Sequence, residues 1–447
     1  MKIFIAVVLC KFVYFIGKKV GRGSSLPGKI VLKLFPDILS KIRMPKTVIA
    51  VSGSNGKTST VEMIAHILRQ NSVNVIWNKE GSNQIEGVAT FLLNNCDTKG
   101  NVCADAVLLE SDERYARLTF KYFTPTHFVI TNLYRDQMTR NAHSEWIFDI
   151  LKDAVKPETL LILNADDPLV SCFANDHDKA VYFSMDENKY STKTPQGVYN
   201  DGKYCPLCKA PLEYEYYNMA HIGRYKCTRC ALHTNDALCR ITDIDLESKK
   251  AVFDGEYEIN LNFASLFNVY NLLAAFTLAT VLGFDKQKPA DALNGYILKS
   301  GRIVQFKINE HNGILLTSKH ENSVSYNQSI DYIKRNNKNS IVMIMVDAIS
   351  RKYYTSETSW LFDIDFDGLA SSKAESIILT GKYAYDLAVR FEFTGINPDI
   401  ITVEPNIDNA VNMLSSSGGD ADIFVVTCFS DKDKFLSRIT QNIVHNN

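Results

Sequence analysis

The sequence has no excess of charge of either sign. Its 447 residues hold 49 Lys and Arg against 50 Asp and Glu, for a formal net charge of −1. This balance excludes a bulk attraction to nucleic acid or to anionic lipid, so any site for a polyanion must be local. Hydrophobic residues at 46% and charged residues at 22% exclude disorder, collagen and a membrane bundle. The length predicts about three domains.

The sequence also lacks a high density of cysteines and a long apolar run. Ten cysteines in a chain of this length are too few for a disulfide scaffold. The apolar run at the N-terminus is interrupted by Lys11 and is too short for a transmembrane helix. A signal peptide is the alternative, but residues 17–23 are basic where a cleavage site would need small residues. We expect a helix that packs on the protein or lies on a membrane surface.

Short β-branched runs alternate with helical patterns and predict an α/β core. The run 47–52 precedes a glycine turn and a helical pattern, which is typical of a strand, a loop and a helix. Repeated units of this kind predict a parallel sheet, with further strands at 73–76, 106–109, 127–130 and 160–163. Residues 185–260 lack helical periodicity and are interpreted as an insertion. A second α/β run follows Gly301, with strands at 314–316, 340–345, 376–380 and 423–428.

The sharpest local pattern is a glycine loop between a strand and a helix, Gly53-Ser54-Asn55-Gly56-Lys57-Thr58-Ser59. Glycines let the backbone wrap a phosphate, and the N–H groups and the helix start supply positive potential. Lys57 would reach the terminal phosphates, and Thr58 can ligate Mg²⁺. Val51 stands where a Walker A motif has its first glycine. An ordinary strand-to-helix turn is the alternative, but the strand and the helix both lie where a phosphate site needs them.

This loop resembles the Mur ligase family, whose members use ATP to make an acyl phosphate that an amine attacks. Further segments resemble the family in the right order, at 108–111, 130–136, 164–168 and 268–275. The resemblance implies that the whole loop 53–59 binds ATP, that Glu110 binds Mg²⁺ and that Asn271 lies near the adenine. Each segment alone is a weak match, and a buried helix explains 268–275 equally well.

Four of the cysteines are paired as Cys205-x₂-Cys208 and Cys227-x₂-Cys230. This is the spacing of a zinc ribbon, in which two tight hairpins present four thiolates to one Zn²⁺. A site closed by four protein ligands is structural. The paired cysteines, with the others scattered, indicate a reducing compartment with a metal site.

A zinc ribbon inside a Mur-like ATPase resembles the MurT family, the ligase-like subunits of lipid II isoglutaminyl synthases. The resemblance implies an α/β fold in three parts, with a lead-in at 1–44, a Mur ligase-like P-loop ATPase domain at 45–300 that carries the ribbon at about 200–235, and a smaller α/β C-terminal domain at 301–447. It implies ATP-dependent amidation of the α-carboxylate of D-glutamate in the lipid II stem peptide. A GatD-type glutamine amidotransferase would supply ammonia as the partner in a heterodimer. The location implied is cytoplasmic, at the inner face of the plasma membrane.

The C-terminal region departs from the MurT pattern. Where the family has Ala-Asp-Gly-x-Asp-x-Ser-Trp, this chain has Tyr354 for the first acid and Glu357 for the second. By the resemblance, Glu357 would complete the glutaminase site as a catalytic residue, with Asp347 as the second candidate. A solvated loop acid is the alternative for Glu357. Residues 319–323 replace Lys-Asn-Pro-x-Gly, and Arg302, which we assign to the ATP site, lacks the acid that usually follows.

Two other functions stay open. One is a MurT paralogue that acts on another carboxylate. The other is a non-catalytic subunit that binds ATP and only scaffolds a partner. The intact Lys57, Thr58 and Glu110 favour catalysis. Zinc ribbons also bind nucleic acid, but the near-neutral charge and the complete set of ATPase segments argue against such a partner.

Overall fold

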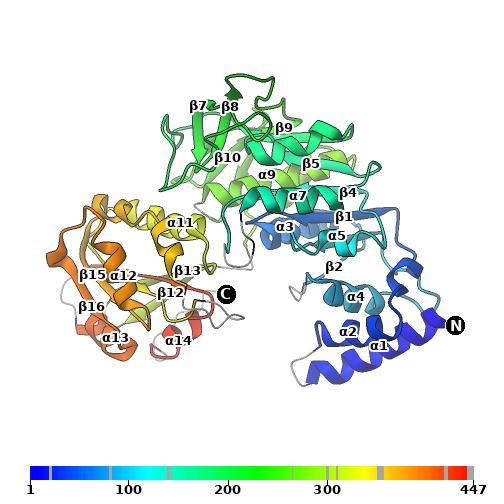
Figure 1. Cartoon of the computed structure of the whole chain (residues 1–447), viewed down its shortest axis with the longest axis horizontal. Coiled ribbons are helices and arrows are strands. Elements are labelled where there is room, and N and C mark those ends of the chain that lie inside the picture. The colour runs from blue at the N-terminus through cyan, green and yellow to red at the C-terminus, as the bar shows by residue number, and fades with distance from the viewer. Residues whose placement is uncertain are drawn as a thin grey trace. The chain divides into compact units, whose positions relative to one another are not determined.

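The computed structural model describes residues 1–19, 23–79, 83–137, 141, 143–263, 265–298, 302–308, 311–349, 357–416 and 421–439 (Figure 1). The chain divides into two compact units. Unit 1 comprises Met1–Tyr134, His143–Gln196 and Asp201–Leu298, and unit 2 comprises Arg135–Ala142, Gly197–Asn200 and Lys299–Asn447. The long boundary lies close to the expected one at 300/301, and the lead-in 1–44 belongs to unit 1.

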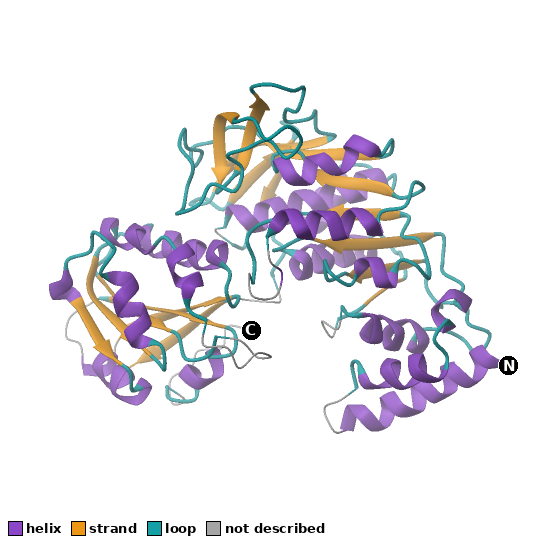
Figure 2. Cartoon of the chain, viewed as in Figure 1, coloured by secondary structure: helices purple, strands orange, loops and turns teal. Residues whose placement is uncertain are grey.

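A nine-stranded sheet forms the centre of unit 1 (Figure 2). Its order is β11-β10-β9-β6-β5-β4-β1-β3-β2. Neighbouring strands of this order pair in parallel from β9 across the sheet to β2. The strands of this sheet are β1 (Thr47–Ser52), β2 (Val75–Trp77), β3 (Ala106–Glu110), β4 (His127–Ile130), β5 (Leu160–Asn164), β6 (Ala180–Met185), β9 (Cys239–Asp245), β10 (Lys250–Phe253) and β11 (Tyr257–Asn260).

Helices cover both faces of this sheet, which explains why the middle positions of its central strands are apolar. In β1, Val48 and Ala50 pack toward α1, α2, α4 and α7, and residues of β3 are buried at every position. On the opposite face, α3 and α9 pack against each other. The helices of unit 1 are α1 (Lys2–Lys19), α2 (Leu26–Leu34), α3 (Lys57–Gln70), α4 (Ile85–Asn94), α5 (Ala116–Thr119), α7 (Ser144–Ala154), α8 (Pro168–Ser171), α9 (Leu266–Val281) and α10 (Gln287–Leu293), with 3₁₀ turns at Ile38–Lys41 and Cys172–Asp176.

The interpretation of 185–260 as one insertion was wrong. Strands β9, β10 and β11 extend the central sheet, and only the segment between β6 and β9 is inserted. Buried and exposed residues alternate along β10 and β11, as in strands that face solvent on one side. The inserted segment holds the hairpin of β7 (Leu212–Met219) and β8 (Ile222–Cys227).

The N-terminal helices are an integral part of unit 1. Helix α1 packs against α2 and α4, and Lys11 donates from Nζ to the carbonyl of Cys96 just past α4, at 2.8 Å. Ala6, Val7 and Cys10 of α1 are completely buried in the same core as the sheet. Among the helices that the structure describes, none has the length and apolarity to cross a membrane.

Unit 2 is built on a six-stranded sheet in the order β12-β13-β17-β14-β15-β16. Only β12 and β13 pair antiparallel. Helices α11 and α12 cover one face and α13 and α14 the other. The elements are β12 (Ile303–Ile308), β13 (His311–Ser318), α11 (Ser323–Lys334), β14 (Ser340–Met345), β15 (Ala374–Thr380), α12 (Ala384–Phe391), β16 (Ile401–Glu404), α13 (Ile407–Ser416), β17 (Asp422–Cys428) and α14 (Lys432–Leu436), with 3₁₀ turns at Ser359–Asp363, Phe366–Ser371 and Pro398–Ile400.

A substitution at Gly28 tests the close contact between α2 and α4. Its N–H donates to Oγ1 of Thr90 at 2.8 Å, and a Cβ at this position would lie 1.9 Å from the carbonyl oxygen of Glu86. Gly28→Ala should therefore lower the free energy of unfolding of unit 1 by about 1–3 kcal/mol, measured in urea. Gly395→Ala is the matched control, because no atom lies within 4 Å of its added Cβ. Equal stability of the two variants would contradict this close approach.

Candidate functional site

The glycine loop lies where the strand order of the unit 1 sheet reverses. Strand β1 has β3 on one side and β4 on the other, and the loop leaves its carboxyl end to start α3. This edge is where open α/β sheets bind ligands. Gly53 and Gly56 both have positive φ, at 136° and 86°, which favours glycine. The loop therefore has the backbone that a phosphate site needs.

Buried polar side chains fix the backbone of this loop. The N–H of Asn55 donates to Oδ1 of Asn132 at 2.9 Å, and Oγ1 of Thr131 donates to the carbonyl of Asn55 at 2.8 Å. A Cβ on Gly53 would lie 2.2 Å from Oγ1 of Thr131. Segment 130–136, singled out by resemblance, thus holds the loop in place through Thr131 and Asn132.

Two polar side chains, those of Thr58 and Glu110, meet at the start of α3. Oγ1 of Thr58 donates to Oε2 of Glu110 at 2.8 Å, so the two expected magnesium ligands are neighbours. Asn78 fixes the backbone of Glu110 through two hydrogen bonds of 2.8 and 2.9 Å. Nζ of Lys57 donates to the carbonyl of Gly53 at 2.5 Å and pairs with Glu113. Sequence reasoning missed Glu113, which lies three residues after the expected Glu110, in the loop that follows β3.

Asn271 of α9 lies beside the glycine loop. Its amide lies against Gly56, where a Cβ would be 2.0 Å from its Oδ1. Its place near the adenine stays a prediction. The side chain is completely buried, and within the described part of the chain Oδ1 has no hydrogen-bond partner. Almost all of α9 is buried, so the apolar pattern of 268–275 does reflect a core helix. Asn271 is a buried polar residue of this helix and faces the loop.

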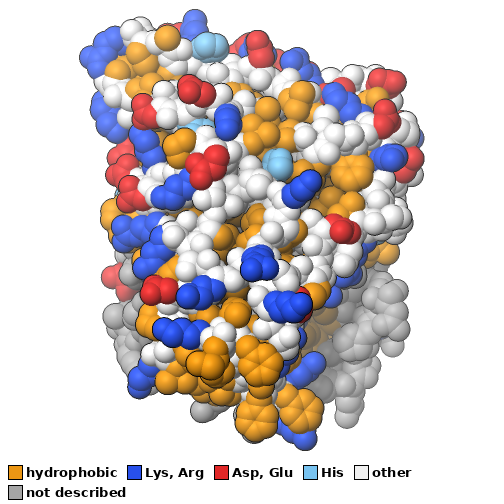
Figure 3. Space-filling model, turned by 90° about the vertical axis from the view of Figure 1, so that its right-hand side faces the viewer, with side chains coloured by type: hydrophobic (Ala, Val, Ile, Leu, Met, Phe, Trp, Pro, Cys, Tyr) orange, Lys and Arg blue, Asp and Glu red, His pale blue; other side chains and the backbone are white. Residues whose placement is uncertain are grey.

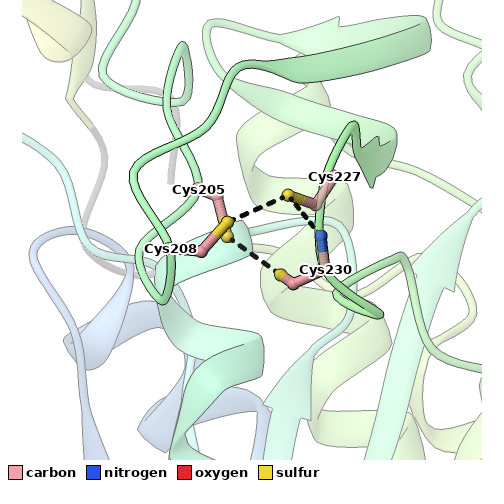
Figure 4. Close-up of side chains that lie close together, drawn as sticks. All are labelled: Cys205, Cys208, Cys227 and Cys230. Carbon is pink, nitrogen blue, oxygen red and sulfur yellow. Dashed lines mark hydrogen bonds between the residues drawn. The ribbon is translucent and has the colours of Figure 1, made fainter.

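The four paired cysteines meet in the inserted segment (Figure 4). Their sulfur atoms all lie within 4.8 Å of one another, with Sγ distances of 3.6 Å between Cys205 and Cys230 and 3.4 Å between Cys208 and Cys227. A tetrahedral zinc site with Zn–S near 2.3 Å needs sulfurs about 3.8 Å apart. Backbone N–H groups of Cys230 and Arg229 donate to Sγ of Cys227 and lower its pKa, which favours the thiolate. These residues fit a zinc ion.

The ribbon is anchored to the ATPase sheet by buried polar contacts. Nδ2 of Asn218 in β7 donates to the carbonyl of Met185 at 2.9 Å, and His221 lies 3.6 Å from Oδ2 of Asp167. Tyr270 of α9 donates to Oδ2 of Asp166 at 2.7 Å. Burial raises the pKa of Asp166 to about 7. The segment 164–168 therefore connects the ribbon to the sheet and to α9.

Glu357 and Asp347, the candidates for the glutaminase site, lie in unit 2. Glu357 is exposed and accepts a hydrogen bond of 2.6 Å from the N–H of Ser359; hydrogen bonding to Ser359 lowers its pKa. Asp347 is held within its own unit by the N–H of Lys382 at 2.9 Å and by an ion pair with Lys434. Burial acts to raise the pKa of Asp347, but the hydrogen bonds from Lys434 and Lys382, together with the nearby positive charges, outweigh it and the pKa is lowered. Tyr354 lies outside the described residues.

Residues 135–137 and 319–322 are paired in unit 2. Asp136 is buried, forms an ion pair with Lys319 and accepts a hydrogen bond of 2.8 Å from Nδ2 of Asn322. Arg302 belongs to the same unit and donates from Nη1 to Oγ of Ser325 at 2.7 Å. Burial lowers the pKa of its guanidinium. Its role toward ATP stays a prediction.

Comparisons with known proteins decide the family. Residues 51–279 match the Mur ligase middle domain, and residues 320–430 match the MurT ligase C-terminal domain. A lipid II isoglutaminyl synthase subunit MurT from Streptococcus pneumoniae is 30% identical over 412 residues, which cover 90% of this chain and 89% of the relative. The chain belongs to the MurT family. A MurT subunit from Staphylococcus aureus is 29% identical, with 92% of both chains covered.

Solved structures share the fold of this MurT family member. A pseudomurein peptide ligase type C from Methanothermus fervidus has a TM-score of 0.71 at 21% identity and covers 92% of this chain and 84% of its own. MurF from Acinetobacter baumannii has a TM-score of 0.65 at 16% identity, with 92% and 80% covered. The α/β Mur ligase fold is thus confirmed, with the four-cysteine insertion. As a MurT family member, the chain is the ligase subunit of an amidoligase.

Proposed function

We propose that this chain amidates the α-carboxylate of D-glutamate in the lipid II stem peptide, using ATP and ammonia. The observation that supports it is one site that gathers the glycine loop, Lys57, Thr58 and Glu110 at the reversal point of the unit 1 sheet. The similarity to MurT subunits along nearly the whole chain supports the substrate. The reaction would take place at the cytoplasmic face of the plasma membrane.

The chemistry needs positioning and charge neutralisation. The carboxylate oxygen attacks the γ-phosphorus of ATP, and ADP leaves. Ammonia then attacks the carbonyl carbon of the acyl phosphate; inorganic phosphate leaves with the former carboxylate oxygen, and a proton is lost to give the amide. Lys57 neutralises the developing phosphate charge, and the loop N–H groups orient the transferred group. Thr58 and Glu110 would hold Mg²⁺, which supplies Lewis-acid stabilisation.

Zn²⁺ in the ribbon would have a structural role. Four cysteines close the coordination sphere, and Thr58 and Glu110 come from other elements. The core around the cysteines is small, with Cys172, Leu212, Tyr225 and Leu232 as its other buried members. Metal binding would therefore contribute much of the folding energy of the ribbon.

A GatD-type glutaminase would supply the ammonia as the second subunit of a heterodimer. Glu357 is our candidate for the acid that orients the imidazole of the partner's Cys-His pair, since a carboxylate fixes its tautomer and stabilises its charged form. Its exposure supports this role. Asp347 is the weaker candidate, because its carboxylate already accepts hydrogen bonds from Lys382 and Lys434.

Lys57→Met tests the phosphate site. Removing this charge should lower ATP turnover by about 100-fold or more, because the charge acts on the transition state. Glu113→Gln breaks the same ion pair, so the thermal unfolding temperatures of the two variants should be similar. Turnover by Lys57→Met at the wild-type rate would remove this loop from the mechanism.

Cys205→Ser tests the zinc site. Elemental analysis should find one zinc per wild-type chain, and the variant should lose it and unfold at a lower temperature. ATP binding should survive better than stability, because the ribbon supplies no phosphate ligand. Cys103→Ser, an exposed cysteine outside the cluster, should change neither quantity. A folded, metal-free wild-type protein with four reactive ribbon thiols would rule out structural zinc.

Glu357→Gln tests the partner site. Glutamine-dependent amidation should fall sharply, whereas amidation with added ammonia should be largely retained because the ATP site is untouched. Glu392→Gln, another exposed glutamate of unit 2, should leave both rates unchanged. Equal loss with both nitrogen sources would place Glu357 in the ligase site or the fold. No loss with either would transfer the role to Asp347 or mean that no glutaminase acts with this chain.

A further inference from the structure

Helix α1 is apolar on two opposite sides, and only one of them is covered. Ala6, Val7 and Cys10 are buried against α2 and α4. The outward side carries large apolar residues that are each 44–64% exposed, namely Phe4, Ile5, Val8, Phe12, Phe15 and Ile16. At roughly 100° per residue these six span an arc of about 120°. A surface helix normally turns polar residues to water, so this stripe needs an occupant.

The charge around this helix is strongly one-sided. Residues 1–46 contain ten Lys or Arg and one acid, Asp37, whereas the rest of the chain has 39 basic against 49 acidic residues. Lys2, Lys18 and Lys19 of α1 are exposed, and α2 exposes Lys29 and Lys33. Figure 3 shows this side of the molecule, with apolar side chains gathered at its lower end and Lys and Arg around them. The near-zero net charge of the whole chain conceals a basic, apolar end.

We propose that α1 lies in the interface of a bilayer rich in anionic lipid, with its apolar stripe in the acyl boundary and its lysines at the headgroups. An apolar face flanked by lysines is the pattern of an interfacial helix, and long lysine side chains reach back to the headgroups while their stems stay apolar. The basic residues around the apolar stripe favour a bilayer over a protein as the partner that covers it. A neutral protein groove would not call for so basic a surround, whereas an anionic leaflet attracts each lysine.

A pocket connects this helix with Asn78, a residue that supports the candidate active site. A pocket of about 440 Å³ is lined by Tyr14 of α1, by Trp77 of β2 and by Asn78, whose side chain holds the backbone of Glu110. A lipid-anchored substrate would approach the candidate site from the side of Trp77 and Asn78. This last step rests on the proposed function, but the membrane contact rests on α1 alone.

Vesicle co-sedimentation of the full chain tests the proposal without any substrate. The protein should bind vesicles of phosphatidylglycerol and phosphatidylcholine, and much less pure phosphatidylcholine. Phe12→Gln/Phe15→Gln should lower the partition coefficient by about tenfold or more, because two side chains leave the acyl boundary. Lys18→Gln/Lys19→Gln should lower it by roughly tenfold at low salt, with a smaller effect at high salt.

The control is an exposed aromatic residue elsewhere. Phe393 of unit 2 is 70% exposed, and Phe393→Gln should leave vesicle binding unchanged. All variants should keep the wild-type unfolding temperature, since the replaced side chains face outward. Absence of wild-type binding to anionic vesicles would overturn the proposal. So would a Phe12→Gln/Phe15→Gln variant that binds vesicles normally but loses self-association or its protein partner, because the stripe would then be a protein interface.

Discussion

The close packing around the glycine loop is the constraint on which the arrangement of unit 1 depends. Gly53 and Gly56 leave no room for a Cβ, because Thr131 and Asn271 fill the space beside them. Three parts of the chain, after β1, after β4 and within α9, must therefore meet at one point. Once they meet, the loop N–H groups are already oriented, so the binding of a phosphate would cost little conformational entropy for ordering them. Oδ1 of Asn271 is buried without a hydrogen-bond partner among the described residues, which is a cost that a purely structural core would avoid.

Much of unit 1 could be predicted because its central strands are buried on both faces. Runs such as 48–51 and 106–109 are apolar at every position, so their strands stand out from the sequence. Strands β9, β10 and β11 escaped prediction because they lie toward an edge of the sheet, alternate with period two and carry Tyr, Asn and Lys. The cysteine pairs could be recognised in the sequence because a zinc ribbon requires this spacing. Glu113 was not, since only the fold brings it to Lys57.

Unit 2 illustrates why departures from a family pattern are hard to interpret from sequence. The segment 319–323 loses the usual Pro and Gly, yet Lys319 and Asn322 bind Asp136, which lies 183 residues before Lys319. A turn that is held by a buried acid does not need proline to fix it. No local pattern could reveal this contact, because neither segment has a periodicity that points to the other. The substitution at Glu357 differs, since that side chain is exposed and its carboxylate bonds only locally, to the N–H of Ser359, among the residues that the structure describes.

Net charge was a poor guide to the surfaces of this protein because it averages over opposite regions. The sequence excludes a bulk attraction to anionic lipid, and that conclusion holds for the chain as a whole. It does not hold for residues 1–46, where basic residues outnumber acids ten to one. Within a Debye length of about 10 Å only local charge matters, so a bilayer facing α1 would meet those lysines and not the acids of the distant sheet. The apolar run that is too short and too interrupted to span a membrane has the length and the flanking charge to lie on one.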